Sequence, residues 1–221
     1  MFKILVMGCD KYSKYTFELF HHCMEKYWPD HPEIIYCTET EQNPYYKTVT
    51  INLPLQQWTR RLNLALGQID SNIVLVMPED TFLRKQVNYQ VLKKLCFYID
   101  NKLIAINLEP PFDCMPCNEI LSIRNPHGKW LTSFMPQLWN KKKLIELTNG
   151  KDLNPRQAEQ LGTNTPYTYG ILATNITDFD FGKVPNVYPY AIVEGRWAKE
   201  MVAFTKKENI QIDFTELGFF D

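Results

Sequence analysis

The sequence lacks the common glycine patterns of nucleotide-binding and hydrolytic enzymes. The motif G-x-G-x-x-G does not follow the first predicted strand, and G-x-x-x-x-G-K-[ST] occurs nowhere in the chain. The nucleophile elbow G-x-S-x-G is also absent. These absences argue against a Rossmann dehydrogenase, a P-loop NTPase and a hydrolase built on an elbow serine.

Long apolar runs and excess charge are missing too. The chain has 221 residues, with 24 Lys plus Arg against 25 Asp plus Glu, giving a net charge of −1. Near neutrality argues against a basic stripe for nucleic acid, so we expect no nucleic-acid partner. No apolar run reaches the roughly 18 residues of a membrane span. No small-residue cleavage site follows the apolar N-terminus, so we expect no signal peptide and a cytoplasmic location.

The six cysteines have only one suggestive spacing. Without a secretion signal, we expect a reducing environment and no disulfide framework. Cys114 and Cys117 form a single C-x-x-C, which lacks the second pair of a structural zinc site. Three nearby prolines predict a loop here, so loop thiols are the favoured interpretation over a metal or redox site.

What the sequence does contain is an alternation of strand and helix patterns. Apolar runs predict strands at 3–7, 33–38, 73–77, 103–108, 120–123, 170–173 and 191–193, with a shorter strand at 48–53. Helical patterns cover 12–27, 55–69, 81–99, 133–147 and 197–207, and Asn154-Pro155 starts another helix. This order predicts a three-layer α/β/α fold with a mainly parallel central sheet. No repeat or linker divides the chain, so we expect a single domain over 1–221.

Acidic residues follow two of the predicted strands. Asp10 comes after the first strand, and Glu79-Asp80 directly follows the apolar run IVLVM. Ligands of open α/β sheets bind beyond the carboxyl ends of strands, and such acids suit Mg²⁺ or Mn²⁺ carrying phosphate oxygens. Asp80 also precedes a predicted helix, where Asp is a preferred N-cap. Both interpretations of Asp80 remain open on spacing alone.

Aromatic, histidine and lysine residues have ordinary structural interpretations. Trp58 and Trp197 fit helical core faces, whereas Trp130 lies in a loop, where an aromatic face could stack on a sugar ring. His21-His22 have no partners spaced for a metal, so we expect packing roles. The run 141–143 predicts a solvated lysine-rich helix face, or an approach to anionic lipid headgroups.

Five ordered segments resemble bacterial GT-A-type glycosyltransferases of capsule, exopolysaccharide and lipopolysaccharide biosynthesis. SFMPQLWNKKKLIEL resembles the family's S-x-Q-P-x-x-W helix start, NPRQAEQLGT its P-W-x-x-E-x-x-G-[ST] segment, and the stretch at 188–213 its closing G-x-W segment. The other segments are CDKYSKYTFELF with KYWPDHP, and QWTRRLNLALGQIDSNIVLVMPEDTFL.

The resemblance implies a GT-A-like fold, with a nucleotide-binding half at 1–108 and an acceptor-side half at 109–221. The donor would be a nucleotide diphosphate sugar, with UDP favoured. Asp10 and Lys11 would lie beside the base or ribose, and Arg61 would point towards the nucleotide. Glu79 and Asp80 match the D-x-D position, and Asp80 is the favoured ligand of a Mn²⁺ or Mg²⁺ ion.

The resemblance also assigns the chemistry. Glu159 matches the acid that removes a proton from the acceptor hydroxyl, which is the role of a general base in direct displacement with inversion. The acceptor would be a glycan or a lipid-linked glycan, reached with peripheral membrane association at the inner face.

Several positions depart from the family pattern. Glu79 replaces an aspartate, Arg156 replaces the tryptophan after Pro155, and Pro136 and Gln137 stand in reversed order. These departures motivate an alternative function, a non-catalytic nucleotide- or glycan-binding protein on the same fold.

Overall fold

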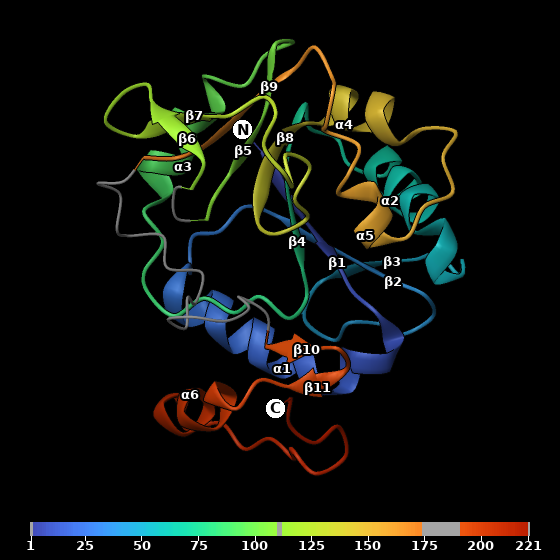
Figure 1. Ribbon diagram of the computed structural model, residues 1–221. Coiled ribbons are helices and arrows are strands. Elements are labelled where there is room, and N and C mark those ends of the chain that lie inside the picture. Colours follow the sequence, from blue (N-terminus) through green and yellow to red (C-terminus); the bar gives the residue numbers. More distant parts are fainter. Residues whose placement is uncertain (1, 110–111, 174–190, 221) are drawn as a thin grey trace.

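The computed structural model describes residues 2–109, 112–173 and 191–220 (Figure 1). The strands are β1 (Lys3–Met7), β2 (Ile34–Thr38), β3 (Lys47–Thr50), β4 (Ile73–Pro78), β5 (Leu103–Asn107), β6 (Cys114–Pro116), β7 (Leu121–Arg124), β8 (Gln137–Asn140), β9 (Thr168–Leu172), β10 (Ile192–Val193) and β11 (Arg196–Trp197). The helices are α1 (Asp10–Tyr27), α2 (Trp58–Gly67), α3 (Tyr89–Cys96), α4 (Lys141–Thr148), α5 (Pro155–Ala158) and α6 (Glu200–Glu208), with a 3₁₀ turn η1 (Leu55–Gln57) before α2.

The centre of the fold is a nine-stranded sheet in the order β3-β2-β1-β4-β8-β5-β9-β7-β6. Strands β3, β2, β1 and β4 pair in parallel. Strand β8 pairs antiparallel with both β4 and β5, so β5 runs in the same direction as β4. Strand β9 is parallel to β5, and β7 is antiparallel to β9. Only β7 and β8 therefore run against the common direction of this sheet.

Alternating side chains of the strands build a core on each face of the sheet. Ile4 and Val6 of β1 join one core, beneath α1, whereas Leu5 joins the other, beneath α2 and α4. Successive side chains of a strand point to opposite faces, so a strand that is apolar throughout requires helices on both sides. The predicted three-layer α/β/α class with a mainly parallel sheet is confirmed (Figure 1).

The helix predicted over 81–99 is much shorter in the structure. Helix α3 begins at Tyr89, where Asn88 is the N-cap and its side chain accepts a hydrogen bond from the Val91 amide. The preceding stretch has no regular secondary structure and buries Phe82 and Leu83, which are 4% and 2% exposed. Their burial in the core beside α1 outweighs the local helix propensity, so the prediction was wrong for 81–88.

The helix predicted over 133–147 was also wrong in its first half. Residues 137–140 form β8, and α4 begins only at Lys141. Leu138 and Trp139 are both fully buried, in the cores on opposite faces of the sheet. That two-sided burial is what a central strand requires, and a helical spacing cannot be distinguished from it over so few residues.

Several smaller expectations can be compared with the structure. Trp58 and Trp197 are 6% and 0% exposed, which confirms that both belong to the core. The helical position predicted for Trp197 was wrong, because Trp197 lies in β11 and α6 begins at Glu200. Asn154 caps α5 in a capping box with Gln157, as its position before Pro155 predicted. All six cysteines are free, but Cys114 begins β6, so the loop predicted there was wrong. No helix of the described residues is long and apolar enough to cross a membrane.

The C-terminal helix α6 packs beside α1. The Glu208 carboxylate, fully buried, accepts hydrogen bonds from Tyr27 Oη at 2.6 Å and Lys26 Nζ at 2.7 Å and contacts His22 Nε2 at 3.1 Å.

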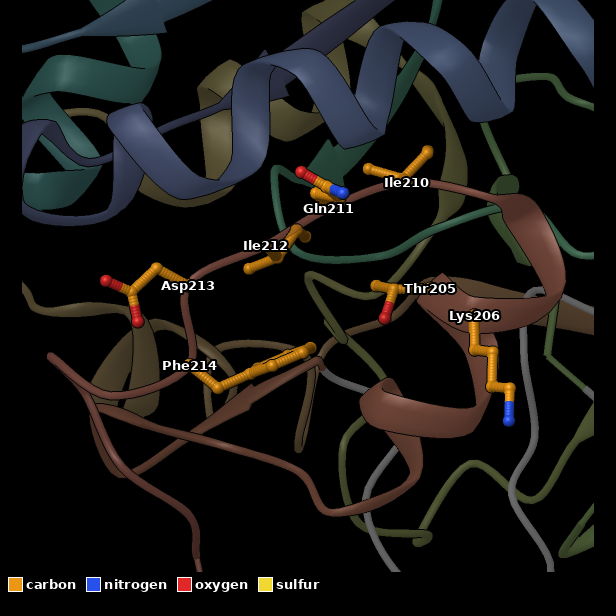
Figure 2. Close-up of a pocket in the computed structure, with 7 residues that line it drawn as sticks. All are labelled: Thr205, Lys206, Ile210, Gln211, Ile212, Asp213 and Phe214. Carbon is orange, nitrogen blue, oxygen red and sulfur yellow. The ribbon is translucent and has the colours of Figure 1, made fainter.

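A groove of about 470 Å³ lies between α6 and the following segment at 210–214 (Figure 2). None of the predicted site residues lines this groove.

Candidate functional site

Acidic residues follow four strands that point in one direction. Asp10 follows β1, Glu39 follows β2, Glu79 follows β4 and Glu109 follows β5. Because β1, β2, β4 and β5 run in one direction, these acids stand at the same, carboxyl edge of the sheet. This is the edge at which open α/β sheets bind ligands.

Glu79 is buried beneath the turn that joins β1 to α1. It is 4% exposed, and its carboxylate accepts hydrogen bonds from Cys9 N at 2.7 Å, Thr16 Oγ1 at 3.0 Å and Tyr36 Oη at 3.2 Å. The residue therefore ties β4 to the N-terminal part of α1 and to β2. The donor contact predicted for Glu79 stays a prediction, and the contacts that the structure shows are structural.

Gly8 makes the close approach at this turn possible. A Cβ atom there would lie 2.7 Å from a ring carbon of Tyr36 and 3.1 Å from the Glu79 carboxylate. The first distance is shorter than real Cβ contacts, so a larger residue would push the turn away from Glu79. Glycine at the end of β1 thus serves the packing of the turn.

Asp10 is locked to the loop after β2. Its carboxylate accepts from the backbone amides of Glu39, Thr40 and Glu41 at 2.8–3.2 Å, and from Thr40 Oγ1 at 2.5 Å. In return, Asp10 N donates to Glu39 Oε2 at 2.7 Å. Partial burial would raise the pKa of Asp10, but these hydrogen bonds outweigh it and lower the pKa. Asp10 is therefore a fixed anion of the β1–β2 rim.

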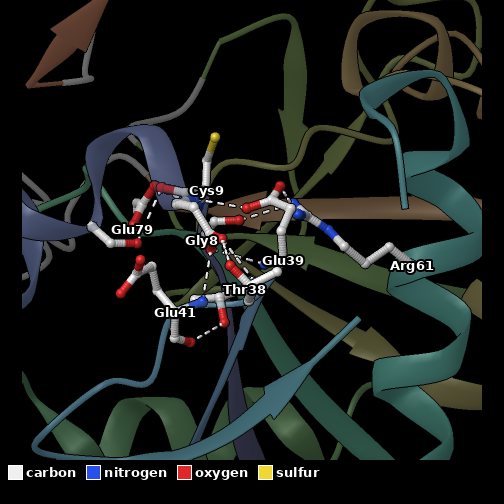
Figure 3. A network of polar contacts seen from close by, with 10 residues as sticks. Gly8, Cys9, Thr38, Glu39, Glu41, Arg61 and Glu79 are labelled. Carbon is white, nitrogen blue, oxygen red and sulfur yellow. Dashed lines mark hydrogen bonds and ion pairs between the residues drawn. The ribbon is translucent and has the colours of Figure 1, made fainter. Parts of the chain in front are cut away.

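Arg61 of α2 reaches the same rim. Its guanidinium donates to Gly8 O at 2.8 Å through Nη2 and pairs with the Glu39 carboxylate through Nη1 (Figure 3). The side chain is 4% exposed, and its Nε has no hydrogen-bond partner among the described residues. The structure thus brings Arg61 to the ends of β1 and β2, while its predicted contact with a nucleotide stays a prediction.

Asp80 does not cap a helix, because α3 begins nine residues later. Its backbone oxygen accepts from Ala191 N at 3.0 Å, and the Ile192 amide donates to its carboxylate. Burial raises the pKa of Asp80 to about 7, and burial beside Asp80 raises that of Glu79 to about 8. The structure therefore removes the capping explanation of Asp80 and leaves a partly buried carboxyl group that lacks a basic partner among the described residues.

The donor set at this edge fits a hard cation in part. Among the described residues, no group of three or more His, Cys, Asp and Glu side chains could hold a metal ion. Mg²⁺ and related ions, however, are often held by one or two carboxylates together with substrate phosphates. Asp80 supplies one such carboxylate, and the neighbouring Thr81 hydroxyl is buried without a partner among the described residues. An acidic rim also needs a cation before it can hold an anionic pyrophosphate.

Glu159 lies at the end of α5, against the segment before β8. The Thr132 hydroxyl donates to Glu159 O at 2.8 Å, and the Phe134 amide donates to the Glu159 carboxylate. Partial burial raises the pKa of Glu159, the Phe134 amide opposes the shift, and the nearby charge of Glu109 adds to it. A carboxyl group with a raised pKa at a ligand edge suits proton abstraction.

Two acids of this edge were missed in the sequence. Neither Glu39 nor Glu109 was among the predicted site residues, although each follows an apolar strand, as Asp10 and Glu79 do. Asn107 at the end of β5 holds Glu109: its Nδ2 donates to Glu109 Oε2 at 3.0 Å, and Glu109 N donates to Asn107 Oδ1 at 2.6 Å. The shared signal was an acid one or two residues after a buried strand.

The remaining predicted residues lie around this edge or apart from it. Lys11 is exposed, and its Nζ approaches the turn between β10 and β11 at Gly195. Trp130 is 51% exposed with φ of 55°, an unfavourable backbone region for a bulky residue. Of the lysine run, Lys141 donates to Ile69 O at 2.5 Å and Lys143 pairs with Glu146 at 2.7 Å. Membrane contact of this run stays a prediction.

Comparison with known proteins gives structural likeness alone. The sequence matches no protein-family model and no curated protein. A nucleotidyl transferase, Mth528, of Methanothermobacter thermautotroptrophicus is 12% identical, with 80% of this chain and 89% of that chain covered and a TM-score of 0.49. A CMP:2-keto-3-deoxy-manno-octonic acid synthetase complexed with CTP is also 12% identical, with coverages of 77% and 89% and a TM-score of 0.48.

TarS of S. aureus is also among the similar structures. TarS 1-349 in complex with UDP is 16% identical, with 78% of this chain covered and a TM-score of 0.43. This chain spans 60% of the length of that fragment. At such identities and TM-scores, the activities of these proteins are not transferred to this chain.

Proposed function

We propose that this protein transfers a sugar from a nucleotide diphosphate sugar, with UDP as the favoured nucleotide, to a glycan or a lipid-linked glycan. The observation that carries the proposal is the partly buried Asp80, which stands at the carboxyl edge of the sheet without a helix to cap. Asp10 and Glu39, which follow β1 and β2, stand at the same edge. Glu159 adds a carboxyl group whose pKa is raised by burial.

The donor would bind along the ends of β1 and β4. Asp10 and Arg61 would shape the rim near the nucleoside, and exposed Lys11 would lie beside its base or ribose. Asp80 would hold a divalent cation together with the donor phosphates, and Glu79 would support the turn from below. When bound, the cation supplies charge neutralisation to the departing nucleoside diphosphate.

Glu159 would act on the acceptor. A sugar hydroxyl is a weak nucleophile, and a carboxylate within hydrogen-bond reach can accept its proton as the new glycosidic bond forms. The oxygen of that hydroxyl bonds to the anomeric carbon while the bond to the diphosphate breaks, so direct displacement inverts the anomeric configuration. Half-exposed Trp130, two residues before Thr132, offers an aromatic face on the acceptor side.

Nucleotide binding can be measured by calorimetric titration with UDP, in the presence and absence of Mn²⁺. We expect wild-type protein to bind UDP about tenfold more tightly with Mn²⁺, a difference of about 1.4 kcal/mol. We expect Asp80→Asn to lose that gain, because the substitution removes the carboxylate that would hold the ion. Asp70→Asn is the matched control, since exposed Asp70 precedes β4 and stands at the opposite edge of the sheet.

The same titration separates the alternatives. UDP binding without turnover of any UDP-sugar would favour the non-catalytic binding module. No heat with any nucleoside diphosphate, with or without metal, would contradict both the enzyme and the nucleotide-binding module.

A further inference from the structure

The side chain of Thr132 contacts the backbone around Glu159. It is 1% exposed, and its Oγ1 donates to Glu159 O at 2.8 Å, with Ala158 O at 3.1 Å also within reach. The same oxygen accepts from Gly162 N at 3.2 Å. One buried hydroxyl therefore joins the last carbonyls of α5 to the turn that follows Glu159.

The short helix needs such an external partner. Helix α5 has only four residues, and its N-terminus is closed by the capping box of Asn154 and Gln157. The last carbonyls of a helix have no partners within the helix. At this end the Thr132 hydroxyl supplies a partner from outside, so the orientation of Glu159 depends on a residue 27 positions away in the chain.

The turn after Glu159 and the segment around Thr132 pack so closely that they can hardly shift relative to each other. A Cβ atom at Gly162 would lie 2.8 Å from Leu131 Cβ and 3.0 Å from Thr132 N. The turn after Glu159 therefore rests directly on the backbone at Leu131 and Thr132. Every residue from Leu131 to Trp139 is buried, so this support is part of the core.

The same segment also contacts the carboxylate. Two residues after Thr132, the Phe134 amide donates to the side chain of Glu159. The main chain and the carboxylate of Glu159 are thus held at two points by one buried segment, and a shift of α5 would break the second contact as well as the first.

We infer that Thr132 is a positioning residue for Glu159: its hydroxyl holds the end of α5 so that the Glu159 carboxylate meets the Phe134 amide and faces the acceptor hydroxyl. This inference rests on the proposed function for its catalytic consequence. The structural part of the inference, that Thr132 is coupled to the carboxylate of Glu159, depends only on the contacts described above.

The test compares Thr132→Val, which keeps the shape but removes the hydroxyl, with Thr132→Ser, which keeps the hydroxyl. For Thr132→Val we expect kcat to fall about tenfold with the donor KM unchanged, and the acidic limb of the kcat/KM profile to move upward by about half a pH unit or more, since the charged carboxylate loses a donor. Thr132→Ser should restore both quantities. Thr205→Val is the control, because Thr205 is equally buried and donates to Met201 O within α6.

A second measurement does not need activity. The NMR chemical shift of the Phe134 amide should titrate with Glu159 in wild-type protein and in Thr132→Ser, and should lose this titration in Glu159→Gln and Thr132→Val. Equal titration in wild type and Thr132→Val, or an unchanged pH–rate profile, would overturn the inference. If the wild type transfers no sugar but the amide titrations differ as expected, the proposed function fails while the positioning role stands.

Discussion

Replacing Glu159 with glutamine is expected to lower the rate of sugar transfer by about 10²- to 10⁴-fold, the usual contribution of a positioned general base. Glutamine has nearly the same size and can still accept from the Phe134 amide, but it cannot take a proton from the acceptor hydroxyl. Binding of UDP should therefore be unchanged, because Glu159 is assigned to the acceptor. Initial rates with a UDP-sugar and a glycan acceptor, together with UDP calorimetry, measure the two effects separately.

The same role for Glu159 predicts how the transfer rate of the wild type changes with pH. A general base must be ionised, so transfer should fall as the pH drops through the pKa of Glu159, which burial holds above the usual glutamate value. Glu159→Gln should lose this acidic limb. Glu146→Gln is the matched control, because exposed Glu146 pairs with Lys143 on α4. Equal rates for wild type and Glu159→Gln would remove Glu159 from the mechanism.

Replacing Glu79 with alanine is expected to lower the free energy of unfolding by about 3 kcal/mol or more. Three donors converge on its carboxylate, and an unsatisfied buried donor costs about 1–3 kcal/mol. Glu79→Gln keeps an acceptor oxygen of the same reach, so a loss of about 1 kcal/mol is expected for this variant. Urea unfolding followed by circular dichroism measures all of these differences.

The control for this series is Glu33→Ala. Glu33 forms an exposed ion pair with Lys3 at 2.7 Å, and such surface pairs contribute about 0–1 kcal/mol. If Glu79→Ala were as stable as Glu33→Ala, Glu79 would not hold the β1–α1 turn. Its carboxylate would then be available for the donor contact that the sequence predicted.

Local patterns in the sequence were sufficient to predict the layers of the fold. Continuous apolar runs at β1, β2 and β4, each followed by a helical pattern, predicted parallel strands with helices on both faces, and the two cores confirm it. Patterns failed where a long-range contact decides the conformation. Phe82 is buried beside α1 rather than in a helix, and Trp139 is buried in a strand that returns between β4 and β5.

The sequence could predict that acids gather at one edge of the sheet, but not which contacts they make there. The rule that acids after buried strands meet at one edge placed Asp10, Glu79 and Asp80 together. It could not show that Glu79 faces inward to Cys9 and Thr16, because those contacts depend on how α1 packs on the sheet. The link of Thr132 to Glu159 likewise joins segments that only the folded chain brings together.

The most direct measurement is a crystal structure of the protein with UDP and Mn²⁺ bound. We expect the nucleoside beside Asp10 and the end of β1, with the diphosphate and the ion at Asp80 and the Glu159 carboxylate facing the open acceptor side. A nucleotide bound away from the carboxyl ends of β1 and β4, with Asp80 touching neither metal nor phosphate, would contradict the proposed sugar-transfer site.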